Sequence, residues 1–455
     1  MPHRIFDKLP SVSDLLENPP LKKLTETVSH SSIVSGVRSY MDRYQRELQA
    51  RTADYRMPPI GDLAETISRW ISGVDAGRAA TVINGTGVMC SSQISQTPLP
   101  VAVLEAMFGR CRDFQSMNVG GDLDQSIDSE ASSLLCQLTN SEAAIVTGNR
   151  AGALYLALAN LPSGSSVVIA RGQLGETFDG IRVPDLIKQA GLQLAEIGTT
   201  NSTTLAEYSD AIDDQTSAII YFDNSNFSGV SAESCPGIEE LAQLAASKKV
   251  PLIVDIGFSH LVDVPFLKNL GLTDVKQVVQ QGANLVVASG GNLLGGPDCG
   301  ILLGKTSQVS GCQSNPMVNA VRASNLTLVA LSSVLELYLT SKQLEDEIAT
   351  LSLVSTSVEN LKHRSERLAT LIGASELVES AESVSATAYL FDQKYSLDSF
   401  AIEVSAVSGK LEELQAKLVS SPYPLLCQEQ DSKIVIDLRY IFPRQDMVVA
   451  EIFAS

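Results

Sequence analysis

Short apolar segments alternate with amphipathic ones between residues 143 and 304, and this alternation constrains the fold more than any other feature of the sequence. Helical patterns lie at 150–160, at 237–249 and near 270–281. Because the apolar segments have no polar face, they predict a mostly parallel sheet covered by helices on both sides, an α/β fold. The expected strands are AAIVT (143–147), SVVIA (166–170), LAEIG (194–198), SAIIYF (217–222), PLIVDIG (251–257), NLVVAS (284–289) and GILLG (300–304).

The flanking segments have a different character. Residues 1–80 carry apolar positions at helical spacing, broken by prolines, which predicts a small helical domain followed by a linker. After residue 325 a long helical stretch precedes two strand-like segments, FAIEVSA (400–406) and KIVIDLRYIF (433–442). A chain of 455 residues exceeds one simple core. We therefore expect three domains: 1–80, 81–325, and a small α+β domain at 326–455.

The chain is acidic, but its charge is unevenly distributed. The net charge is −19, which argues against a generic nucleic-acid-binding protein, whereas residues 1–80 carry 11 Lys and Arg against 10 Asp and Glu. Any contact with tRNA is therefore expected in this first segment. The seven cysteines form no C-x-x-C pair and predict neither a zinc site nor a disulfide framework. The sequence shows no secretory signal and no apolar run of the roughly 18 residues that span a membrane, so we expect a cytoplasmic protein.

Two expected strands end in residues that could contact a cofactor. Asp255 ends PLIVD, where a buried carboxylate needs a partner. That partner is either the cationic ring nitrogen of a cofactor or a hydrogen bond in a cap or loop. The turn TGNRAG (147–152) places Gly148, Asn149 and Arg150 at the start of a helix. Backbone N–H groups there favour a phosphate, although an ordinary strand–helix turn has the same sequence character.

A third strand leads into the glycine-rich segment SGGNLLGGP (289–297). Ser289 and Gly290 open a turn that either lets the backbone approach a ligand closely or is a simple tight turn. Because ligands of parallel sheets bind at the carboxyl ends of the strands, these segments together predict a site at that edge.

Many motifs along the chain follow the order of one known family. The sequence resembles the bacterial selenocysteine synthases, L-seryl-tRNA(Sec) selenium transferases, over nearly its whole length. The motifs are LPSVSDLLENP, INGTGV (83–88), EIGTTN (196–201), VDIGFSHLVDV (254–264), SGGNLLGGPDCGILLGK (289–305), NLTLVAL (325–331) and IDLR (436–439).

This resemblance implies an architecture and a reaction. The architecture is the fold type I of pyridoxal phosphate (PLP) transferases, with a helical N-terminal tRNA-binding arm and a ring-shaped homo-oligomer, a decamer in bacterial members. In the family reaction a lysine forms a Schiff base with PLP, and seryl-tRNA(Sec) is converted to selenocysteinyl-tRNA(Sec) with selenophosphate. Asp255 matches the aspartate that keeps the ring nitrogen of PLP protonated.

The departures from the family pattern concentrate at its site positions. The lysine of the family segment S-G-D-K-L-L-G-G-P is replaced by Asn292, and an amide cannot form an imine. In NAVRASN (319–325), Arg322 matches one of two family arginines that bind the substrate anion, while Asn325 replaces a lysine. Lys305 follows the expected strand GILLG, where the family often has a lysine outside the site, so we do not expect it to substitute for the missing amine. Other family charges are absent at Gln96, Gln173 and Ser202 and in VGGDL (119–123).

These departures favour a paralogue that keeps the fold without the aldimine chemistry. Such a protein could bind tRNA, bind PLP non-covalently, or join an active homologue in a hetero-oligomer as a regulatory subunit. Two alternatives stay open at this point: an active selenium transferase, and a lyase of the same fold acting on a small anionic substrate. The N-terminal arm counts against the lyase, which would not need to bind tRNA.

Overall fold

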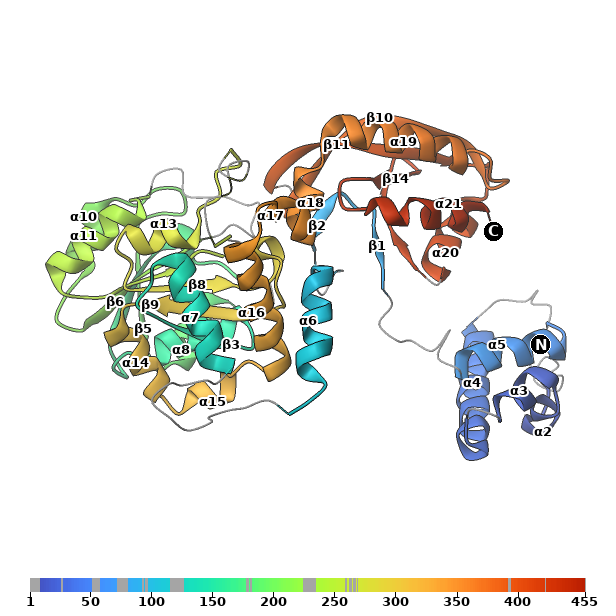
Figure 1. Ribbon diagram of the computed structural model, residues 1–455, viewed down its shortest axis with the longest axis horizontal. Coiled ribbons are helices and arrows are strands. Elements are labelled where there is room, and N and C mark those ends of the chain that lie inside the picture. The colour runs from blue at the N-terminus through green and yellow to red at the C-terminus, as the bar shows by residue number, and fades with distance from the viewer. Residues whose placement is uncertain are drawn as a thin grey trace. The chain divides into compact units, whose positions relative to one another are not determined.

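The computed structural model describes residues 9–25, 28–50, 58–71, 81–91, 94, 97–114, 127–176, 180, 182–223, 235–257, 260, 261, 264, 267, 269–391, 394–421 and 423–454. The chain divides into two compact units. The first consists of Met1–Ile83 and Gln415–Leu425, and the second of Asn84–Leu414 and Leu426–Ser455 (Figure 1).

The first unit contains a helical core near the N-terminus. Its helices are α2 (Val12–Leu16), α3 (Pro19–Leu24), α4 (His30–Ala50) and α5 (Ile60–Ile71). Ser11 caps α2 by accepting a hydrogen bond from the N–H of Asp14, and prolines open α3 where no N–H is needed. Trp70 packs edge-on against Tyr40, with 5.7 Å between the ring centroids. The helical character expected for this region is therefore present, with a core of Leu15, Leu21, Ile33, Val37, Leu63, Ala64 and Ile67.

A seven-stranded sheet forms the centre of the second unit, in the order β3-β9-β8-β7-β6-β4-β5. Neighbours among β4 to β8 pair in parallel, whereas β9 is antiparallel to both β8 and β3. The mostly parallel sheet expected from the apolar segments is confirmed. Its strands are β3 (Ala143–Thr147), β4 (Ser166–Ala170), β5 (Gln193–Ile197), β6 (Thr216–Phe222), β7 (Leu252–Asp255), β8 (Leu285–Ser289) and β9 (Gly300–Gly304).

Both faces of this sheet are covered by helices. Within β4, Val167 and Ile169 pack into one core cluster, while Val168 and Ala170 pack into the other. The first cluster includes side chains of α8 (Arg150–Ala159), α9 (Val183–Gln189) and α14 (Thr306–Ser314). The second includes side chains of α7 (Ile127–Thr139), α10 (Leu205–Ala211), α11 (Ile238–Lys248), α13 (Val275–Gln280) and α16 (Asn325–Thr340). Burial on both faces explains why the strands are apolar throughout.

A five-stranded sheet, in the order β13-β14-β11-β10-β2, forms most of the C-terminal part. The expected strands at 400–406 and 433–442 correspond to β11 (Lys394–Ala406) and β14 (Lys433–Asp437). They are accompanied by β10 (Val378–Phe391), which the sequence did not indicate, and by β2 (Val88–Cys90) and β13 (Gln428–Gln430). Strand β2 precedes the large sheet in the chain, whereas the other four strands follow it. The smaller sheet therefore pairs a segment from the start of the second unit with segments from its end.

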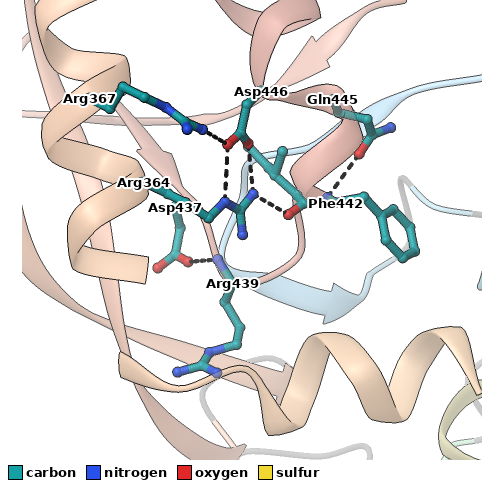
Figure 2. Close-up of polar contacts among 8 residues, drawn as sticks. Arg364, Arg367, Asp437, Arg439, Phe442, Gln445 and Asp446 are labelled. Carbon is teal, nitrogen blue, oxygen red and sulfur yellow. Dashed lines mark hydrogen bonds and ion pairs between the residues drawn. The ribbon is translucent and has the colours of Figure 1, made fainter. Parts of the chain in front are cut away.

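Paired charges connect helix α19 (Val358–Ile372) to the start of α21 (Asp446–Ala454), as Figure 2 shows. Arg364 and Arg367 each place a guanidinium nitrogen 2.7 Å from a carboxylate oxygen of Asp446. Arg439, from the IDLR motif, donates to the backbone oxygens of residues 354, 356 and 398. Arg439 therefore links the segment before α19 to strand β11.

The remaining helices and strands are short or lie outside the two larger sheets. They are β1 (Ile83–Asn84), α6 (Val101–Cys111), η1 (Arg171–Gln173), η2 (Asn292–Leu294), α15 (Met317–Val321), α17 (Leu344–Glu347), α18 (Ala349–Ser355), α20 (Leu411–Ser420), β12 (Leu425–Leu426) and η3 (Pro443–Gln445). Among the described residues, no helix combines the length and the apolar character that crossing a membrane would require.

Candidate functional site

The candidate site lies where the central parallel strands end. Phe222 at the end of β6 is in register with Asp255 at the end of β7. Ser289, the last residue of β8, is in register with Gly300, the first residue of β9. The same Gly300 pairs with Thr147 at the end of β3. The fold therefore brings the three segments singled out from the sequence to one edge of the sheet.

A buried ion pair occupies the middle of this edge. Asp255 is fully buried, and both Nε and Nη2 of Arg150 lie 2.7 Å from its Oδ1 atom. The Arg150 guanidinium carbon also lies 5.2 Å from the ring centroid of Phe222, so the cation packs over an aromatic face. The N–H of Gly257 donates to the same Oδ1 atom at 3.0 Å. The partner that Asp255 needs is supplied by the protein itself.

The ion pair sets the charge of the site. Burial raises the pKa of the Asp255 carboxyl, and the Arg150 guanidinium opposes that rise. A guanidinium keeps its charge in proteins, so the pair as a whole is neutral while the carboxyl is ionised. The Asp255 Oδ2 atom is buried and has no hydrogen-bond partner among the residues that the structure describes. An uncharged hydrogen-bond donor could therefore bind this oxygen without adding net charge to the site.

The turn after β3 satisfies several of its own hydrogen-bond donors. Asn149 caps α8 and accepts from the N–H of Gly152 at 2.7 Å, while the N–H of Gly148 donates to the carbonyl of Val321 at 2.7 Å. The Thr147 hydroxyl donates to the carbonyl of Asn149 at 2.8 Å. An anion at this turn would have to compete with these internal acceptors.

Asn292, which the sequence analysis aligned with the family lysine, is held by hydrogen bonds. Its φ angle is 58°, in the left-handed region that asparagine tolerates better than most residues. Its N–H donates to the Thr97 hydroxyl at 3.2 Å, and the Cys90 thiol donates to its Oδ1 atom at 3.1 Å. Burial raises the pKa of Cys90, so this thiol stays protonated. The amide is thus integrated into the packing between the segment before α6 and the glycine-rich turn.

The glycine-rich turn itself is tightly packed. Ser289 is buried, and its hydroxyl accepts from the N–H of Gly291 at 3.4 Å. A Cβ atom at Gly290 would collide with the Cys299 sulfur. Packing against the next strand is therefore sufficient reason for a glycine at position 290, whether or not a ligand binds.

Arg322 lies beside the turn after β3 but points to another partner. Its backbone forms an isolated bridge with Thr147, and its guanidinium lies 2.7 Å from the Asp128 carboxylate. Both side chains line a small cavity of about 190 Å³, together with Asn319. The second arginine that the sequence singled out is thus also paired with a carboxylate of the same chain.

Lys305 lies far from Asn292. It follows Gly304, which is in register with Leu285, the first residue of β8. Asn292 comes after the opposite end of that strand. At about 3.3 Å per residue, the length of β8 separates the two positions by roughly 15 Å, so Lys305 does not replace the missing amine. Gln96 and the segment 119–123 lie outside the described residues.

Sequence reasoning missed three side chains of this site. Phe222 packs against the guanidinium of Arg150, and the Cys90 thiol donates a hydrogen bond to Asn292. Asp128 forms an ion pair with Arg322. For Phe222, the only indication in the sequence was its position at the end of an apolar strand. Cys90 follows the INGTGV motif, but nothing in that motif indicates its contact with a residue about 200 positions away.

Comparisons with known proteins identify the family and the fold of the chain. Residues 82–442 match the family model described as L-seryl-tRNA selenium transferase. The chain is 30% identical to the L-seryl-tRNA(Sec) selenium transferase of Geobacter sulfurreducens, with 96% of each chain covered. It is 27% identical to that of Alkaliphilus oremlandii, over 99% of this chain and 98% of the relative.

A solved structure supports the fold. D-glucosaminate-6-phosphate ammonia-lyase superposes with a TM-score of 0.59 at 17% identity, covering 82% of this chain and 94% of that one. This superposition confirms the predicted fold class, fold type I of the PLP-dependent enzymes. Membership of this family implies PLP as the cofactor.

Proposed function

Because the chain belongs to the L-seryl-tRNA selenium transferase family, we propose that it is a tRNA-binding member that does not perform the family's lysine-dependent chemistry. The observation that carries this proposal is Asn292. It stands at the family lysine position, and its backbone and side chain are both hydrogen-bonded, to Thr97 and Cys90. An amide is neither a nucleophile nor a base at neutral pH, so the residue contributes binding and packing only.

The other charged residues of the site support the same reading. Arg150 and Arg322 are each paired with a carboxylate of the chain, Asp255 and Asp128. Cations paired in this way are poor anchors for an anionic substrate, because the anion must displace an existing partner. The edge of the sheet is therefore well suited to stability and poorly suited to phosphoryl or selenophosphate binding.

We place the tRNA contact in the N-terminal segment, 1–80, as a functional domain distinct from 81–325 and 326–455. Its charge is close to neutral in an otherwise acidic chain. Lys23 and Arg38 are exposed on its helices α3 and α4. In this proposal the protein acts in the cytoplasm as a homo-oligomer, or as a regulatory subunit in a hetero-oligomer with a lysine-bearing homologue.

A paired assay tests the proposal. The purified protein is incubated with seryl-tRNA(Sec), selenophosphate and PLP, and the aminoacyl group is identified by mass spectrometry; tRNA binding is measured by filter retention. A lysine-bearing family member serves as the control. We expect tRNA retention without selenocysteinyl-tRNA above the no-protein level. Turnover comparable to that of the control would overturn the proposal.

A further inference from the structure

We propose that Arg150 takes the place of the cofactor's ring cation at Asp255, so that the site excludes pyridoxal phosphate, including its non-covalent binding. This goes beyond the proposed function, in which the chain lacks the family's lysine-dependent chemistry but the cofactor could still bind. A chain that lacked only the lysine could still hold the cofactor without a covalent bond.

The first argument is the charge at the bottom of the site. In PLP enzymes of this fold a buried aspartate pairs with the protonated ring nitrogen. Here the carboxylate of Asp255 already pairs with Arg150 through two nitrogens at 2.7 Å. A protonated ring would place a second cation beside one fully buried carboxylate. Without water to screen it, that excess positive charge is strongly unfavourable.

The free carboxylate oxygen also disfavours the cofactor ring. Asp255 Oδ2 lacks a hydrogen-bond partner among the described residues, so while Arg150 keeps the carboxyl ionised a ligand could reach this atom only as a donor. An unprotonated pyridine nitrogen has no hydrogen to donate, and a protonated one brings the excess charge described above. Neither protonation state of the cofactor ring therefore suits this atom while Arg150 is present.

The third argument is space and phosphate binding. The Arg150 side chain is only 10% exposed, and its guanidinium packs over Phe222 next to the ends of β6 and β7. At the neighbouring turn the N–H groups of Gly148 and Gly152 are bonded within the protein. The residues present thus fit neither the ring nor the phosphate of the cofactor.

The test measures non-covalent binding of pyridoxamine phosphate by calorimetry. This compound has the ring and the phosphate of PLP, but it lacks the aldehyde that would attach to surface lysines. We expect no saturable binding to the native protein and one-to-one binding to the Arg150→Gln variant. The expected tightening of Kd is at least about tenfold, the effect of about 1.4 kcal/mol. Arg182→Gln, which removes an exposed arginine paired with Asp185, is the matched control and should behave like the native protein.

Each outcome decides the proposal. One-to-one binding to the native protein overturns it, and so does a folded Arg150→Gln variant that still fails to bind. If that variant does not fold, Asn292→Lys is treated with PLP and borohydride instead. No trapping at position 292 supports exclusion by Arg150, whereas trapping there overturns it. Borohydride trapping of one equivalent on a single lysine of the native protein would instead contradict the proposed function, so the two failures are distinguishable.

Discussion

Arg150 reaches from the first turn of α8 to the carboxylate at the end of β7, and the pair is closed to solvent. The two residues are 105 positions apart in the sequence. The sequence placed both at the same edge of the sheet, because one follows a strand and the other ends one. It did not indicate that they pair, because the sequence of a turn predicts the direction of the backbone but not where the end of a long side chain lies.

Arg150→Gln should reduce the free energy of unfolding by about 3 kcal/mol at pH 7, because it leaves a buried carboxylate without its counter-ion. Chemical denaturation of the variant and of Arg182→Gln provides the comparison. The control removes an exposed ion pair and should lose less than about 1 kcal/mol. Equal losses in the two variants would show that the buried pair contributes no more than a surface one.

The same variant should show a pH-dependent loss. Burial raises the pKa of Asp255, and removing Arg150 removes the interaction that opposes the rise. The folded variant then retains a proton that the unfolded chain releases above about pH 3.9, so its stability falls as pH rises. The stability difference from the native protein should therefore grow between pH 4 and pH 7. A difference that is constant with pH would contradict this assignment of charge.

At the scale of elements, the apolar strands were predictable because burial on both faces requires a continuous apolar run. All seven expected strands of the large sheet are present, and no end differs from the expected one by more than two residues. Strand β10 was not predictable in the same way. Its sequence, VESAESVSATAYLF, mixes small and polar residues, and most of its side chains are partly buried or exposed. Long antiparallel pairing with β11 holds this strand in place.

The contact between α19 and α21 provides a test at this scale (Figure 2). Asp446→Ala should reduce the free energy of unfolding by about 3–5 kcal/mol, because it leaves the buried guanidinium of Arg364 without its carboxylate. Arg367→Ala should cost less than about 1 kcal/mol, since that side chain is 62% exposed. Urea denaturation of both variants checks the order, and a larger loss for Arg367→Ala would be inconsistent with the described packing.

At the scale of the whole molecule, the N-terminal segment (1–80) is nearly neutral, whereas the rest of the chain, here called the body (81–455), is acidic. Repulsion between the body and the phosphates of a nucleic acid restricts where tRNA can bind. Lys23→Glu combined with Arg38→Glu should weaken tRNA binding several-fold and reduce its dependence on salt concentration. Filter binding at several salt concentrations measures both effects.

Matched charge reversals on the body, Lys188→Glu with Lys342→Glu, serve as the control, since both lysines are exposed there. They should leave tRNA binding nearly unchanged. Equal weakening by the two pairs would mean that the body contributes as much as the N-terminal segment, contrary to the proposed arrangement.

The most direct test of the central claim, that Asn292 leaves this chain without aldimine chemistry, is borohydride trapping on the native protein. The protein is mixed with PLP, its visible spectrum is recorded, and borohydride reduction is followed by peptide mass analysis. The account predicts no stoichiometric label on a single lysine. A reduced adduct on one lysine at one equivalent per chain would contradict it and would make selenium transfer the leading function again.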